Sequence, residues 1–172
     1  MRSSCIAVNV DSKLVSELSI YGVYTLLLFV PKELIVTVGK LGKQKFPRGY
    51  YTYTGSALGK GVSLKNRISR HLKKEKRMFW HIDYLLEDKK VEVRSIIVAE
   101  TKEKIECELN RYLKGTYGAK ILVKGFGASD CKKGCESHLL HFSESIEAEK
   151  LVQKLVGHLQ RLQGVLSVIV IN

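Results

Sequence analysis

The feature that most constrains the fold of this chain is its longest apolar run, residues 20–30. A helix that crosses a bilayer needs about 20 apolar residues, so this run is too short to span a membrane. Residues 23–30 within it are rich in aromatic and β-branched types, which favour strands. The run therefore predicts a buried β-strand, and we expect no membrane association.

Further strands and helices are predicted along the chain in mixed order, which favours an α+β fold with an antiparallel sheet over a doubly wound one. Pro31 and Lys32 separate the first two strands and predict a tight hairpin between them, and residues 39–49 indicate a loop. Strands are expected at residues 33–38, 50–54, 91–99, 120–123, 138–142 and 164–171, and helices at residues 62–74, 79–86, 102–113 and from a capping Ser143 to residue 162.

The charge of the chain is unusual. It has 29 Lys and Arg against 17 Asp and Glu, a net charge of +12, in 172 residues. A surplus of this size indicates a polyanionic partner. Nucleic acid is the first candidate, and an anionic membrane surface or structural RNA would give the same signal.

The cysteines indicate free thiols or a metal site. The first residues do not resemble a secretory signal, because Asp11 interrupts any apolar segment, and we expect a cytoplasmic location. Disulfides are rare in that compartment. The four cysteines are Cys5, Cys107, Cys131 and Cys135.

Two tyrosines are placed on neighbouring predicted strands. Tyr24 lies just after Gly22, and Tyr53 lies just before Gly55. A phenol ionises near pH 10, and positive neighbours can lower that value until it can accept a proton from water. Spacing alone favours the simpler explanation that tyrosines are common in strands.

The predicted helix 62–74 carries basic residues on one face. Arg67, Arg70 and His71 would lie near the end of the third strand, where the planar guanidinium group suits a phosphodiester transition state. A solvated basic face is the alternative. The residues expected to contact the DNA backbone without sequence preference are Arg70, Lys73, Lys74, Lys76 and Arg77.

Two carboxylates lie on the predicted helix 102–113. Glu106 and Glu108 are two positions apart and cannot share a helix face. At most one of them can point into a site and bind Mg²⁺ or a similar ion. The other is then solvated, as most glutamates on helices are.

These residues together resemble the GIY-YIG nuclease superfamily. Its pattern is a Gly-x-Tyr strand, a Tyr-x-Gly strand, a helix carrying Arg and a later helix carrying Glu. Three runs, residues 49–59, 80–86 and 125–131, resemble its compact Uri-type endonuclease-like branch. The resemblance covers residues 22–142 and leaves residues 1–21 and 143–172 as extensions.

The resemblance implies a GIY-YIG-like fold with a small central antiparallel sheet of three core strands flanked by helices. It also implies hydrolysis of DNA phosphodiester bonds with one Mg²⁺ or Mn²⁺ ion. It prefers Glu106 to Glu108, because its pattern places Glu directly before Cys107. The implied catalytic roles are water activation by Tyr24 or Tyr53, charge stabilisation by Arg67, proton transfer by His71 and metal binding by Glu106.

Two departures from the superfamily pattern concern the site. The gap between the tyrosine motifs is long, so residues 31–48 form an insertion. The Asn that often completes the site has no clear equivalent, and Ser129 or Asp130 are the candidates to replace it.

A separate cluster could bind zinc. Cys131, Cys135, His138 and His141 offer four ligands within a short segment. The spacing is more compressed than that of the usual zinc finger, and a loop with free thiols is the alternative.

Three functions remain open from the sequence. The first is a metal-dependent DNA endonuclease, in repair or defence. The second is a non-catalytic nucleic-acid-binding module of the same fold, and the third is a zinc-dependent interaction protein associated with RNA. The set of Tyr24, Tyr53, Arg67 and Glu106 favours the first, and the sequence does not predict an oligomeric state.

Overall fold

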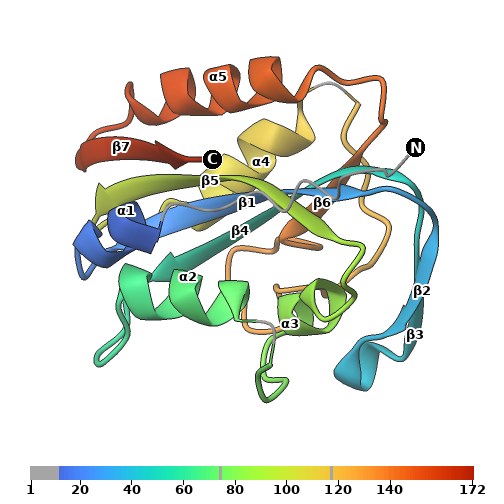
Figure 1. Cartoon of the computed structure of the whole chain (residues 1–172). Helices are drawn as coiled ribbons and strands as arrows, with labels where there is room; N and C mark the ends of the chain where they lie inside the picture. Colours follow the sequence, from blue (N-terminus) through green and yellow to red (C-terminus); the bar gives the residue numbers. More distant parts are fainter. Residues whose placement is uncertain (1–11, 74, 117) are drawn as a thin grey trace, which may run out of the picture.

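The computed structural model describes residues 12–73, 75–116 and 118–172. Its centre is a five-stranded sheet in the order β6-β4-β1-β5-β7, with every neighbouring pair antiparallel (Figure 1). The strands are β1 (Gly22–Val30), β4 (Gly49–Ala57), β5 (Glu92–Thr101), β6 (Leu139–Phe142) and β7 (Val165–Ile171).

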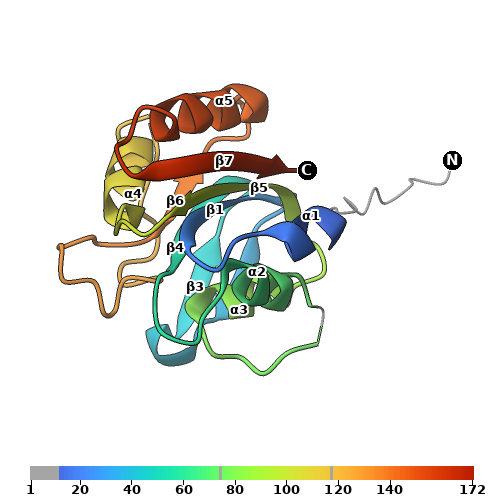
Figure 2. The same cartoon turned by 90° about the vertical axis from the view of Figure 1, so that its left-hand side faces the viewer.

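Helices cover both faces of this sheet (Figures 1 and 2). Alternate residues of β1 serve the two faces: Leu26 and Leu28 join one buried cluster, and Val23 and Leu27 join the other. Burial on both sides explains why β1 is an almost continuous apolar run. One face carries α1 (Ser12–Glu17), α2 (Leu64–Leu72) and α3 (His81–Leu86), and the other carries α4 (Glu106–Lys114) and α5 (Ala148–Leu159).

The predicted α+β class with an antiparallel sheet is confirmed, and the sheet is larger than the three strands expected. The core strands β4, β1 and β5 are extended by β6 at one edge and β7 at the other. An uncovered edge on β5 would leave a row of unpaired backbone groups, which β7 satisfies. The C-terminal residues 143–172 therefore complete the same sheet.

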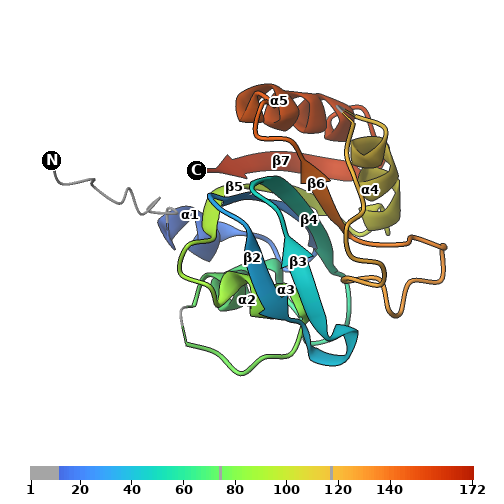
Figure 3. The same ribbon diagram turned by 90° about the vertical axis from the view of Figure 1, so that its right-hand side faces the viewer.

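The predicted hairpin between the first two strands is wrong. β2 (Leu34–Thr37) pairs with β3 (Lys43–Phe46) in a separate two-stranded sheet, with the short helix η1 (Gly39–Leu41) between them (Figure 3). β1 has no free edge for β2, because β4 and β5 occupy both sides. The segment predicted as a loop thus contains β3, and the inserted residues form this hairpin.

Two smaller predictions are also wrong. Of the predicted strand 120–123, only Lys120 forms a bridge, with His141. Ser143 does not cap the last helix, because that helix begins at Ala148, after Glu147. The hydroxyl of Ser143 lies 3.0 Å from that of Ser145. Among the described residues, no helix is long and apolar enough to cross a membrane.

Candidate functional site

The sheet register brings Tyr24 and Tyr53 onto one face, beneath α2. Tyr24 pairs with Gly55 and Leu26 pairs with Tyr53, so the two phenols are diagonal neighbours on β1 and β4. Both are buried, with 1% and 5% of their surface exposed. The Gly-x-Tyr and Tyr-x-Gly motifs are therefore two sides of a single strand pairing.

Gly55 provides the space for the phenol of Tyr24. A Cβ atom at this glycine would lie 2.6 Å from the Tyr24 hydroxyl oxygen. Real Cβ contacts are essentially never this short, so a larger residue would force the ring to move. The glycine of the Tyr-x-Gly motif is explained by the tyrosine of the other strand.

Replacing Gly55 by alanine is expected to destabilise the protein by about 1–3 kcal/mol, because overpacking displaces the buried ring. Urea unfolding measures the effect. Gly59→Ala is the matched control, since a Cβ there meets nothing nearer than 3.9 Å. Equal stability of the two variants would contradict the steric role of Gly55.

Tyr24 begins a chain of polar contacts that runs through His71 to Asp83. The Tyr24 hydroxyl lies 2.7 Å from Nε2 of His71, and Nδ1 of His71 lies 3.5 Å from Oδ1 of Asp83. All three side chains are buried, and Asp83 is fully so. His71 was predicted as a site residue from the resemblance, whereas Asp83 was not predicted.

Asp83 is held in place by its second oxygen. Oδ2 accepts hydrogen bonds from Nη2 of Arg70 at 2.7 Å and from the backbone N–H groups of Phe79 and Trp80 at 3.1 and 3.0 Å. The two backbone groups lie at the N-terminus of α3, where N–H groups lack partners within the helix. The same carboxylate thus accepts hydrogen bonds at the N-terminus of α3 and lies beside Nδ1 of His71.

The environment fixes the protonation of these groups. Burial lowers the pKa of His71, although Asp83 opposes the shift. Burial raises the pKa of Tyr24 to about 12, although Arg67 opposes it. Burial disfavours ionised Asp83, but its contacts with His71, with backbone N–H groups and with Arg70 keep its pKa well below the ordinary value. At neutral pH these shifts keep Tyr24 protonated, His71 neutral and Asp83 ionised. In the tautomer whose Nδ1–H faces Asp83, Nε2 of His71 accepts the hydrogen bond from Tyr24.

Arg67 lies beside this chain on α2. Its guanidinium carbon is 4.7 Å from the centre of the Trp80 ring, and its charge opposes the rise in the pKa of both Tyr24 and Tyr53. Its buried Nε has no hydrogen-bond partner among the described residues. Arg67 is thus positioned by stacking on Trp80.

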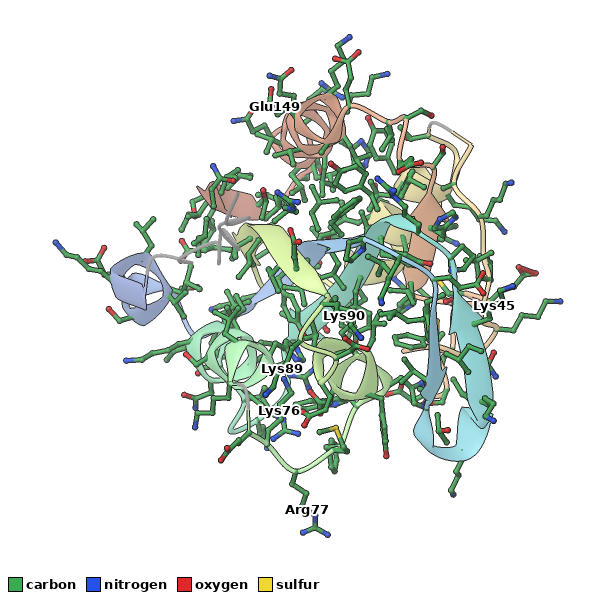
Figure 4. All side chains as sticks on the ribbon, turned by 45° about the vertical axis from the view of Figure 1, so that its right-hand side comes forward. Lys45, Lys76, Arg77, Lys89, Lys90 and Glu149 are labelled. Carbon is green, nitrogen blue, oxygen red and sulfur yellow. The ribbon has the colours of Figure 1, made fainter. Side chains whose placement is uncertain are left out.

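The basic residues after Arg67 differ in how free they are. Arg70, which is predicted to contact DNA, is paired with Asp83, and its guanidinium carbon lies 4.8 Å from the centre of the Trp80 ring. Lys76 donates to the carbonyl oxygens of His71 and Lys73 at the end of α2. The side chains of Lys73 and Arg77 are exposed, and Arg77 extends away from the protein (Figure 4); Lys74 lies outside the described residues.

The two carboxylates of α4 differ in orientation. Glu106 is half-buried, and its Oε2 is buried without a hydrogen-bond partner among the described residues, whereas Glu108 is exposed. Glu106 and the exposed Asp130 both act electrostatically on His138, and Asp130 also acts on Tyr53. Glu106 therefore lies near His138, and Asp130 lies between the surroundings of His138 and those of Tyr53.

The loop before β6 closes this region. Gly127 has a positive φ of 66°, and a Cβ there would lie 2.8 Å from the Tyr53 ring and 3.4 Å from Cβ of His138. Its backbone N–H donates to Nδ1 of His81 at 3.0 Å. This loop therefore links the tyrosines to a second group of residues around His138.

That second group contains four potential metal ligands. The sulfur of Cys107 lies 3.5 Å from that of Cys131 and 3.8 Å from Nε2 of His138. With the sulfur of Cys135 included, all ligand atoms lie within 4.8 Å of one another. Of the four zinc ligands predicted from the sequence, three are present and Cys107 replaces the fourth.

His141 is not part of this cluster, so its prediction as a zinc ligand is wrong. It lies within β6, where it pairs with Tyr51, and its Nε2 is 3.2 Å from the carbonyl oxygen of Arg48. His138 precedes the strand and faces α4 instead. Cys107 was missed because it is 24 residues from Cys131 in sequence.

The chain matches one protein-family model, described as a domain of unknown function, DUF123, over residues 23–161. This span contains Tyr24, Tyr53, His71, Asp83 and the Cys/His cluster, and it ends just after α5. Neither the curated proteins nor the solved structures give a match. The match covers well over half of the chain, which therefore belongs to the DUF123 family.

Proposed function

We propose that this protein is a GIY-YIG-type endonuclease that hydrolyses DNA phosphodiester bonds with one divalent metal ion. The observation that carries the proposal is the Tyr24–His71–Asp83 chain beside the guanidinium group of Arg67. A buried base oriented by a carboxylate and placed next to a cation is suited to a reaction that moves a proton and develops negative charge. The net charge of +12 supports a nucleic-acid substrate.

The proposed reaction is the attack of a water oxygen on phosphorus, which breaks the P–O bond to a deoxyribose oxygen; that leaving oxygen takes a proton from solvent. Tyr24 passes its proton to Nε2 of His71 and accepts a proton from the water, and Asp83 stabilises the resulting imidazolium. Tyr53 orients the water from the neighbouring strand. Arg67 donates hydrogen bonds to the non-bridging phosphate oxygens as their charge increases.

Glu106 fits the role of metal ligand. Its buried Oε2 has no partner among the described residues, and carboxylate oxygens are preferred by Mg²⁺ and Mn²⁺. A bound divalent ion would add positive charge next to the scissile phosphate. The exposed Asp130 is the candidate for a second polar contact, in place of the Asn of the superfamily pattern.

A non-catalytic nucleic-acid-binding module is the second candidate. The near-complete burial of both tyrosines favours it, because a buried phenol reaches a substrate less readily than an exposed one. In that case Arg67, Lys73 and Arg77 would serve phosphate binding alone.

The test of the proposed function is cleavage of labelled plasmid and branched DNA with Mg²⁺ or Mn²⁺. Wild-type protein is expected to cut, and Glu106→Ala is expected to lose cutting by at least about 10²-fold while DNA binding persists. Glu108→Ala is the matched control, because this exposed carboxylate lies two residues away on the same helix. Binding without metal-dependent cutting by wild-type protein would support the second candidate.

A further inference from the structure

We propose that Cys107, Cys131, Cys135 and His138 bind one structural zinc ion, which fastens the N-terminus of α4 to the loop before β6. Zinc binding is independent of the proposed nuclease activity. Its consequence, that the ion sets the position of Glu106, rests on that proposed function.

The separations around the Cys107 sulfur fit a tetrahedral zinc site. Zinc–sulfur bonds of about 2.3 Å and zinc–nitrogen bonds of about 2.0 Å place neighbouring ligand atoms about 3.5–3.8 Å apart. The observed separations are 3.5 Å between the Cys107 and Cys131 sulfurs and 3.8 Å from the Cys107 sulfur to Nε2 of His138. A disulfide would require about 2.05 Å.

The set of ligands is that of a closed structural site. Three thiolates and one imidazole are a common set for structural zinc, and they leave no position for water or substrate. Zinc with three thiolates has a net charge of −1. Lys132 and Lys133 lie between the two loop cysteines in the sequence.

The position of the ligands explains what the ion would hold together. Cys107 lies in the first turn of α4, Cys131 and Cys135 lie in the loop that follows Gly127, and His138 lies just before β6. In Figures 2 and 3 this loop projects beside α4, beyond the edge of the sheet. A second contact joins the loop to the segment just before α4: Nζ of Lys133 donates a hydrogen bond to the carbonyl oxygen of Lys104, at 2.9 Å.

The cluster is also joined to the candidate active site. Glu106 directly precedes Cys107, and a Cβ atom at Gly127 would contact both Tyr53 and His138, so this glycine lies between the two side chains. A bond from zinc to Cys107 would therefore fix the helical turn that carries Glu106. The proposed catalytic carboxylate then depends on an ion that does not itself react.

The first experiment measures zinc per chain in the purified full-length protein by elemental analysis. One equivalent is expected in the wild type, and Co²⁺ substitution is expected to give the absorption bands of a tetrahedral thiolate site. Cys107→Ala and Cys131→Ala are each expected to lose the equivalent. His141→Ala and Cys5→Ser are the matched controls and are expected to keep it.

Two results would overturn the zinc proposal. One is reduced wild-type protein that neither contains zinc nor takes up added Zn²⁺ or Co²⁺. The other is loss of zinc in His141→Ala with retention in Cys107→Ala. The Co²⁺ spectrum of wild-type protein keeps the test decisive even if the cysteine variants do not fold.

The zinc and nuclease proposals fail separately. Zinc content and the Co²⁺ spectrum are measured without DNA, so an inactive protein with one zinc ion would refute only the nuclease. Glu106→Ala is expected to lose cutting and keep its zinc. If zinc-free protein that remains folded still cuts DNA at the wild-type rate, the ion does not set the position of Glu106.

Discussion

Replacing Arg67 by alanine is expected to lower the rate of DNA cleavage by about 10²–10³-fold, the usual effect of removing one preorganised donor at a developing oxyanion. Arg67 is stacked 4.7 Å from the Trp80 ring centre, and its charge acts on both tyrosines. Its removal takes away positive charge where the phosphate would bind. It also removes a charge that lowers the pKa of Tyr24, so this pKa would rise further. Single-turnover cleavage measures the rate of the chemical step.

Two further variants separate these roles of Arg67. Arg67→Lys keeps the charge but loses the planar fork of donors, so we expect it to recover only part of the rate. Arg77→Ala removes an exposed positive charge that is not part of the Tyr24–His71–Asp83 chain. It is expected to weaken DNA binding with little change in the rate of the chemical step. Equal loss of rate in Arg77→Ala and Arg67→Ala would contradict a specific role for Arg67.

Local sequence patterns predicted most elements of the fold, because each such element has its own periodicity. The run of β1 and the apolar stripe of α2 are examples. Pairing was less predictable, since it depends on which edges are free in the complete sheet. β2 follows β1 closely yet pairs with β3, and β7 returns from the C-terminus to complete the edge beside β5.

The candidate site shows the same division. The strand motifs place Tyr24 and Tyr53 together because a single register aligns them. Asp83 was missed because its sequence context suggests only a residue near the start of a helix, and its contact with His71 depends on how α3 packs against α2. The sequence spacing favoured His141 as the fourth zinc ligand because it lies close to His138 in the chain, whereas Cys107 is distant in sequence.

Asp83→Asn is expected to have the second large effect, on both activity and stability. An amide cannot match the charge of Arg70, and because that side chain is 26% exposed we expect a loss of stability below the cost of about 3–5 kcal/mol for a fully buried pair. The amide can also donate to Nδ1 of His71, which favours the tautomer whose Nε2 cannot accept the proton of Tyr24. In an Asp–His pair joined by a hydrogen bond, this change lowers the rate on the order of 10⁴-fold. Across the 3.5 Å between His71 and Asp83 we expect a smaller loss.

The pH dependence of the free energy of unfolding distinguishes the contribution of the Asp83 charge from that of its side-chain packing. Its pKa in the folded protein is below the ordinary 3.8, so its contribution to stability is complete above that value and is lost as the pH falls toward the folded pKa. The stability difference between wild type and Asp83→Asn should therefore be largest near pH 7 and shrink below about pH 4.

Asp88→Asn provides the control for Asp83. Its Oδ1 accepts a hydrogen bond from the backbone N–H of Lys90 at 2.9 Å, which an amide oxygen can also accept. We expect this variant to have the stability and the DNA cleavage rate of the wild type. If Asp83→Asn lost stability but retained its cleavage rate, Asp83 would support only the packing of α3 against α2. Loss of both, with binding retained, would mean that one buried carboxylate joins the folding of α3 to the proton transfer through His71.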